Sequence, residues 1–203
     1  MRRKENKLPT KPVLSEQEKY QLKQDLEHLC ERYWINNGYK KTSIRALCQE
    51  AKISIGTFYT LYPTKEMLFF NVLNKIQKRL SECFLECIEE NKSKAGFARA
   101  LQAMLVEYLD KPFLYDTTSE DFRLFKSKLT PKMIHQLEFD NFHLFRRGIV
   151  LAGLRLKKEE NFAFSVYNTL FSSIKAKETI SSSYNYLPVL NFMITEMTNI
   201  LFD

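Results

Sequence analysis

The fold of this chain is decided by residues 42–66, TSIRALCQEAKISIGTFYTLYPTKE. The apolar positions of the first half share one helical face at i, i+3, i+4 and i+7 spacing, and they are Ile44, Leu47, Cys48 and Ala51. Ser43 or Thr42 can cap that helix, and Ser54 can cap a second one over 55–61. Pro63 and Thr64 end the second helix and begin a third. Two short helices around a tight turn predict a helix-turn-helix.

Two runs in this stretch, ISIGTFY at 53–59 and YPTKEML at 62–68, resemble the signature of TetR/AcrR-type transcriptional regulators. Gly38-Tyr39 ahead of Thr42-Ser43 also agrees, and the resemblance covers roughly the first third of the chain. It implies an all-α fold, with an N-terminal three-helix helix-turn-helix domain followed by an α-helical bundle for ligand binding and dimerisation.

Composition supports the helical class. The chain has only five glycines in 203 residues, below the usual ~7%, and no useful alternation typical of strands. No apolar run reaches the roughly 18–20 residues of a membrane span, and the basic N-terminus has no apolar run behind it, so neither a membrane segment nor a signal peptide is expected. Four scattered cysteines fit a reducing cytoplasm better than a disulfide scaffold.

Positive charge is concentrated toward the N-terminus. Residues 1–66 hold 13 of 31 Lys and Arg and 8 of 24 Asp and Glu, a net of +5, whereas the other 137 residues carry 18 and 16, a net of +2. This asymmetry favours contact with phosphate at that end. We expect a disordered basic arm at 1–14, a DNA-binding domain at 15–66 and a helical ligand-binding and dimerisation domain at 67–203. The first helix should begin at a capping box, Ser15 with Glu18, and end at Gly38.

A helix in the major groove reads bases from near its N-terminus. The residues expected to contact DNA are Thr42, Ser43, Arg45, Ser54, Ile55, Gly56, Thr57, Tyr59, Thr60, Tyr62 and Lys65. Gly56 lets the backbone approach closely, and Arg45 is the bidentate guanine reader in range. The resemblance implies phosphate contacts from Ser43, Tyr59 and Lys65 and base contacts from Arg45, Ile55, Thr57 and Thr60. It also implies that Tyr59 and Tyr62 form a pair in which one faces phosphate and the other packs inward, while Phe58 enters the core.

Three positions depart from the family pattern. Lys52 stands where the turn usually has glycine, which predicts a lysine at positive φ at a cost of on the order of 1 kcal/mol. Ile55 and Leu61 replace residues that are commonly polar. Together they predict an unusually apolar reading surface, and with it the alternative that the chain no longer reads DNA.

Helices are expected at 65–90, 95–110, 119–128, 131–151, 159–179 and 187–202. The second half is rich in aromatic residues, which usually form plain core, but a cavity between such helices suits a small apolar ligand. The residues expected to bind it are Phe142, His143, Phe145, Tyr167 and Asn168. The last two helices carry stripes at helical spacing, and the resemblance implies that they pair with their copies in a dimer, through Phe162, Val166, Thr169, Leu190, Met193, Met197 and Ile200. Burial of these stripes within one subunit is the alternative.

Other candidate chemistry is weak. Cys83 and Cys87 lie at i, i+4 on an apolar stripe with no histidine nearby, which favours buried structural thiols over a metal or redox site. His135 and His143 are too far apart to share a metal by themselves. No nucleophile motif, phosphate loop or metal-ligand cluster appears, so no enzyme, cofactor or metal is expected. The sequence favours a homodimeric, ligand-responsive repressor that binds a palindromic double-stranded operator; the alternative is a ligand-binding or protein-interaction module of the same fold.

Overall fold

The computed structural model describes residues 14–111, 119–173 and 186–203, apart from the side chains of 138–140. Its helices are α1 Glu16–Lys41, α2 Ile44–Glu50, α3 Ile55–Leu61, α4 Lys65–Glu90, α5 Lys94–Asp110, α7 Glu120–Lys126, α8 Pro131–Leu151, α9 Glu160–Ser172 and α11 Tyr186–Leu201. The predicted all-α class is confirmed for these residues, whose only β-type pairing is an isolated bridge between Leu156 and Phe202. Within them, no helix has the length and apolarity needed to cross a membrane.

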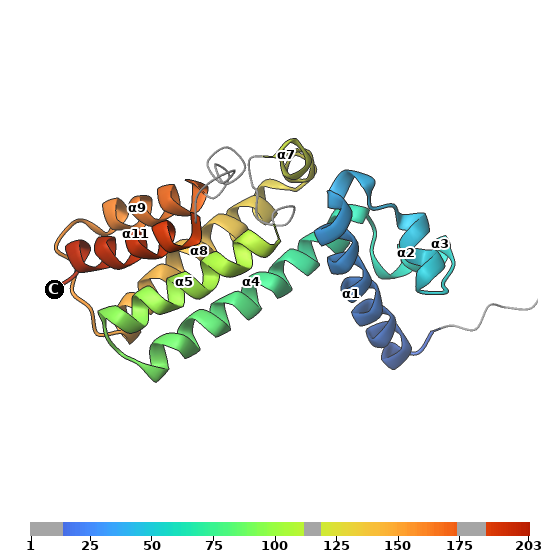
Figure 1. Cartoon of the computed structure of the whole chain (residues 1–203). Coiled ribbons are helices and arrows are strands. Elements are labelled where there is room, and N and C mark those ends of the chain that lie inside the picture. The colour runs from blue at the N-terminus through green and yellow to red at the C-terminus, as the bar shows by residue number, and fades with distance from the viewer. Residues whose placement is uncertain (1–13, 112–118, 174–185) are drawn as a thin grey trace, which may run out of the picture.

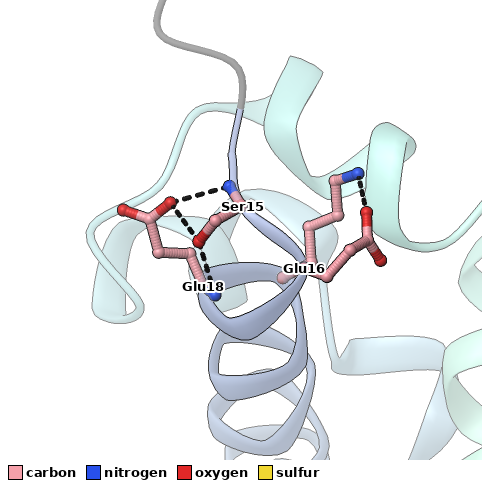
Figure 2. Close-up of polar contacts among 4 residues, drawn as sticks. Ser15, Glu16 and Glu18 are labelled. Atoms are coloured by element: carbon pink, nitrogen blue, oxygen red, sulfur yellow. Dashed lines mark hydrogen bonds and ion pairs between the residues drawn. The ribbon is translucent and has the colours of Figure 1, made fainter.

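Hydroxyl caps set most helix starts where the sequence placed them. Figure 2 shows the capping box of α1, in which Ser15 Oγ accepts from the Glu18 N–H and the Glu18 carboxylate accepts from the Ser15 N–H at 2.8 Å. Side-chain caps at Ser43, Ser54 and Thr64 begin α2, α3 and α4 in the same way. These groups satisfy backbone donors that a helix leaves open at its N-terminus.

The long helix α4 connects the two ends of the molecule (Figure 1). Its first part packs against α1, and α2 and α3 lie beyond α1 at that end. Its later part is joined by α5 and α8, with α9 and α11 on their far side. We call α1–α3 with the first half of α4 the head. We call the second half of α4 together with α5, α8, α9 and α11 the bundle.

Two hydrophobic cores lie along this axis. The head core includes Leu26, Trp34, Leu47, Phe58 and Phe69 from the head, but it also takes Phe122 and Phe125 from α7 and Leu129 and Leu137 from the segment that begins α8. The bundle core is built from the second half of α4 and from α5, α8, α9 and α11. Packing therefore places α7 and the start of α8 with the head, although they follow α5 in sequence.

One expectation about α4 needs correction, and parts of two other expected segments lie outside the described residues. Cys83 is exposed and Cys87 is partly exposed, because Phe84 and Ile88 are the residues of α4 that turn into the bundle core; the prediction of two buried thiols is wrong for Cys83. The helix expected over 159–179 is seen as α9 to Ser172, and its remainder from 174 lies outside the described residues, as do residues 1–13 of the expected basic arm.

Candidate nucleic-acid interface and ligand cavity

The turn between α2 and α3 is held by local backbone and side-chain bonds. Lys52 adopts φ 54°, the positive angle expected where the family pattern has glycine. The Ile53 N–H donates to the Cys48 carbonyl at 3.0 Å, and the Thr57 N–H donates to Ser54 Oγ at 3.0 Å. These bonds fix the angle at which α3 leaves the turn.

One face of α3 is open. Ile55 and Tyr59 are each 48% exposed, and Gly56 and Thr60 are exposed beside them. The Thr60 hydroxyl donates its proton to the Gly56 carbonyl at 3.0 Å, so toward an outside group its oxygen can only accept. Acceptors of this kind suit the amino groups of adenine and cytosine, and the Ile55 methyls suit the methyl of thymine.

The opposite face of α3 is closed. Phe58 is fully buried, as predicted, and Leu61 is 5% exposed. Leu61 therefore adds nothing to the outer surface, and the expectation that it makes that surface apolar is wrong. Of the two apolar substitutions, only Ile55 contributes apolar surface to the open face of α3.

Two residues expected to contact DNA are inside the protein. Thr42 has no exposed surface, and its hydroxyl donates to the Gly38 carbonyl at 2.8 Å. Tyr62 is 1% exposed and donates to Glu27 Oε1 at 2.6 Å, so it is the inward member of the tyrosine pair and Tyr59 is the outward one. Burial, and secondarily the bond to Glu27, raises the pKa of Tyr62. These two side chains tie the helices of the head together.

Lys65 also points inward. Its ammonium donates to the Tyr39 carbonyl and lies 4.0 Å from the centre of the Tyr39 ring. Partial burial lowers its pKa, against the opposing pull of nearby Glu66. In this structure Lys65 supports the junction of α1 and α4 through one of its donors, and its expected contact with phosphate stays a prediction.

The charge that remains on the surface of this region is positive. Lys40, Lys41, Arg45 and Lys52 are exposed. Glu50, the acidic residue among them, accepts from the Tyr33 hydroxyl at 2.8 Å and pairs with Arg32. The bond from Tyr33, followed by that from Arg32, lowers the pKa of Glu50.

A second candidate site is a cavity of about 220 Å³ in the bundle. Its walls come from α4, α5, α8 and α9, and they are Phe84, Leu101, Met104, Tyr108, Asn141, Leu144, Phe145, Phe164, Tyr167, Asn168, Phe171 and Ser172. None of these described lining residues carries a charge. Burial raises the pKa of Tyr108 to about 12.

Three of the five predicted ligand residues, Phe145, Tyr167 and Asn168, line this cavity. Phe142 lies behind it, packed on Phe164 with ring centres 5.0 Å apart, and His143 faces a separate open groove between α4 and α8. The Tyr167 hydroxyl is bonded to Thr198 at 2.9 Å in the core, so Tyr167 offers a ligand its ring. The sequence reasoning did not include Asn141, which adds a second amide to Asn168 in the cavity wall.

The outer face of α11 is apolar, and α9 adds one large exposed apolar side chain, Phe162, among polar neighbours. Phe162 is 55% exposed, Phe192 65% and Ile200 64%, with Val189 and Met193 also exposed. Of the residues expected at a dimer interface, Leu190 is 1% exposed and belongs to the bundle core, and Met197 packs partly against that core. Val189 and Phe192 are exposed on α11 although they were not predicted to be, because α11 has two apolar stripes and the sequence does not say which one faces outward.

Residues 31–72 match the family model for bacterial regulatory proteins of the tetR family. The match spans the end of α1, both helices of the helix-turn-helix and the start of α4. None of the curated proteins matches the chain in sequence.

Solved structures with the same fold extend the likeness to the bundle. A TetR family transcription regulator from Marinobacter aquaeolei is 16% identical, with a TM-score of 0.63, 93% of this chain and 100% of that one covered. FadR from Bacillus subtilis in complex with stearoyl-CoA is 14% identical, with a TM-score of 0.62 and coverage of 86% and 96%. A putative transcriptional regulator from Saccharomonospora viridis in complex with choline is 11% identical, with a TM-score of 0.72 and coverage of 91% and 99%.

Proposed function

We propose that this chain is a member of the tetR family of bacterial regulatory proteins and acts as a homodimeric, ligand-responsive transcriptional repressor; the match of residues 31–72 to the family model and the shared fold support this. The observation that carries the proposal is the open face of α3. Ile55, Gly56, Tyr59 and Thr60 are exposed on a helix that is capped at its start and anchored by its other face. An exposed helix of this kind fits the major groove.

The contacts divide by chemistry. Arg45, Ile55, Thr57 and Thr60 read base edges, and Gly56 permits close approach. The hydroxyls of Ser43 and Tyr59 contact phosphate, and Ser54 helps to hold the start of α3. Exposed lysines add contacts without sequence preference. Thr42, Tyr62 and Lys65 act inside the head and support this surface.

Dimerisation follows from the outer faces of α9 and α11. Large exposed apolar side chains such as Phe162, Phe192 and Ile200 lie on adjacent helices, and a second copy of the same face would remove them from water. Val166, Thr169 and Met193 lie on or beside that surface. A twofold dimer presents two α3 helices, which suits a palindromic operator.

The ligand occupies the cavity of the bundle. Its described walls are aromatic and uncharged, with amides from Asn141 and Asn168, so a small and largely apolar molecule fits best. Neighbours of the same fold in complex with stearoyl-CoA and with choline support a ligand-binding role. The ligand changes DNA binding only as far as it binds one arrangement of the dimer more tightly than the other.

The test is a mobility shift of the purified protein on DNA flanking its own gene, followed by selection from a random DNA pool. We expect a specific complex that is lost in Tyr59→Ala. Tyr20→Ala is the matched control, because Tyr20 is an exposed tyrosine on α1 outside the helix-turn-helix. Failure to select any sequence from the pool would reject the repressor and favour a ligand-binding or interaction module.

A further inference from the structure

Helix α7 contacts the head through two aromatic residues. Phe122 and Phe125 are buried in the head core. The Phe125 ring lies 5.1 Å from Trp34 and 5.4 Å from Tyr39, centre to centre. Figure 1 shows α7 near the end of α1, well away from α2 and α3. Helix α7, which follows α5 in sequence, therefore contacts the head at the end of α1.

Asp121, at the start of α7, makes the polar part of this contact. Its Oδ2 accepts from the Tyr39 N–H at 2.6 Å, and its Oδ1 accepts from the Lys40 N–H at 2.7 Å. Both oxygens of one carboxylate thus bind consecutive backbone N–H groups about eighty residues away in sequence. Bonds to an ionised acceptor are the stronger kind.

Gly38 makes this geometry possible. It has φ 76° and ψ 173°, which breaks α1 just before the two N–H groups that Asp121 binds. A Cβ at this position would lie 2.8 Å from Asp121 Oδ2, too close to be accommodated without a shift. Only glycine meets both demands, the positive φ and the close approach of the carboxylate.

Tyr39 is bound on its other sides by the start of α4. Its carbonyl accepts from Lys65, and its hydroxyl donates to Glu66. The N–H, the C=O and the side-chain hydroxyl of this one residue are therefore held by α7 and α4. Three helices meet at Tyr39, and two of them enter the bundle or lead directly to it.

We propose that Asp121 is a positioning residue for DNA binding, which fixes the head on the bundle by holding the break in α1 at Gly38. The proposal rests on the proposed function. Residues 127–130 join α7 to α8, and α8 carries Asn141, Leu144 and Phe145 into the cavity wall. If a ligand displaces α8, the displacement is transmitted through α7 and the Asp121 bonds to α1. Helix α4 offers a second connection between the cavity and the head. Movement of the head changes the fraction of dimers whose two α3 helices match the operator.

The first test is amide hydrogen exchange on the full-length protein. Asp121→Ala removes both acceptors, and Asp121→Asn keeps the shape but only one carbonyl acceptor. In the alanine variant we expect the amides of Tyr39 and Lys40 to exchange faster by about tenfold or more, as for the loss of a bond to a charged acceptor, with a smaller change in the asparagine variant. Glu120→Ala is the matched control, because Glu120 is the exposed acidic neighbour in the same turn of α7; its exchange should equal that of the wild type. Unchanged exchange in both Asp121 variants would overturn the proposal.

The second test is operator affinity on DNA selected with the wild type. If about a tenth of the dimers that lack both Asp121 bonds keep the matching arrangement, Asp121→Ala weakens binding by up to about tenfold, Asp121→Asn weakens it less, and Glu120→Ala leaves it unchanged. Faster exchange without any loss of affinity would show that Asp121 holds α1 but does not position the head for DNA, and would overturn the proposal. A wild type that binds no DNA would reject the proposed function. The exchange result would still show whether Asp121 holds the backbone at Tyr39 and Lys40.

Discussion

The head core and the bundle core are both rich in aromatic side chains, yet they are arranged differently. In the head, the centre of the Trp34 ring lies 4.7 Å from that of Phe69 and 5.1 Å from that of Phe125. The rings therefore fill the space between α1, α4 and α7. In the bundle, Phe145, Phe164 and Tyr167 form part of the wall of a cavity of about 220 Å³. The head is packed for a fixed shape, and the bundle retains a space that a ligand can fill.

Replacing one leucine by phenylalanine in each core should give the largest difference in stability between the head and the bundle. Leu68 is fully buried in the head core, so Leu68→Phe should lower the free energy of unfolding by about 1–3 kcal/mol through overpacking. Leu144 lines the cavity, so Leu144→Phe has room for the larger ring and should cost less than about 1 kcal/mol. Urea unfolding followed by circular dichroism measures both. Equal losses would mean that the bundle is as tightly packed as the head.

A smaller effect separates packing from DNA contact within the head itself. Gly56 lies on the open face of α3, and an added Cβ would meet only Ser54 Oγ, at an ordinary 3.6 Å. Gly56→Ala should leave the fold intact and raise its stability by up to about 0.5–1 kcal/mol. Operator affinity should fall at least about fivefold, the lower range for a lost base contact, because the new methyl group meets the DNA.

Thermal unfolding and fluorescence anisotropy on the same Gly56→Ala sample check these opposite changes. A variant with unchanged operator affinity would show that the backbone at Gly56 does not approach DNA closely.

The sequence predicted the head in detail because its signals are local. Each of Ser15, Ser43, Ser54 and Thr64 accepts from an N–H group in the next turn, so a hydroxyl at the right spacing marks a helix start. The positive φ of Lys52 followed from the turn that the resemblance implied. The match of residues 31–72 to the tetR family model bears out that resemblance.

Side-chain directions were harder to predict, because they depend on contacts far away in sequence. Tyr62 points inward since Glu27 on α1 accepts its hydroxyl, and Lys65 does so since the carbonyl of Tyr39 is within reach. Nothing near Asp121 in sequence indicates that it binds the backbone at residues 39 and 40. Such contacts become visible only when the helices are assembled.

The bundle shows a second limit. An apolar stripe predicts that a helix buries one face, but α11 has a stripe on each side: Leu190 and Ile194 face the core, while Phe192 and Ile200 face outward. Periodicity alone cannot rank the two stripes. For the same reason, periodicity could not separate Cys83 from its neighbour Phe84, and of the two only Phe84 faces the bundle core.

The most direct test of the account is the salt dependence of binding to a selected operator, measured by fluorescence anisotropy at equilibrium. Lys40, Lys41, Arg45 and Lys52 are exposed on each head, and a dimer presents two heads. If about four of these eight side chains meet phosphate, the logarithm of the binding constant falls linearly with the logarithm of salt concentration with a slope of about −3.6. A slope near zero would contradict the central claim that this surface binds the DNA backbone.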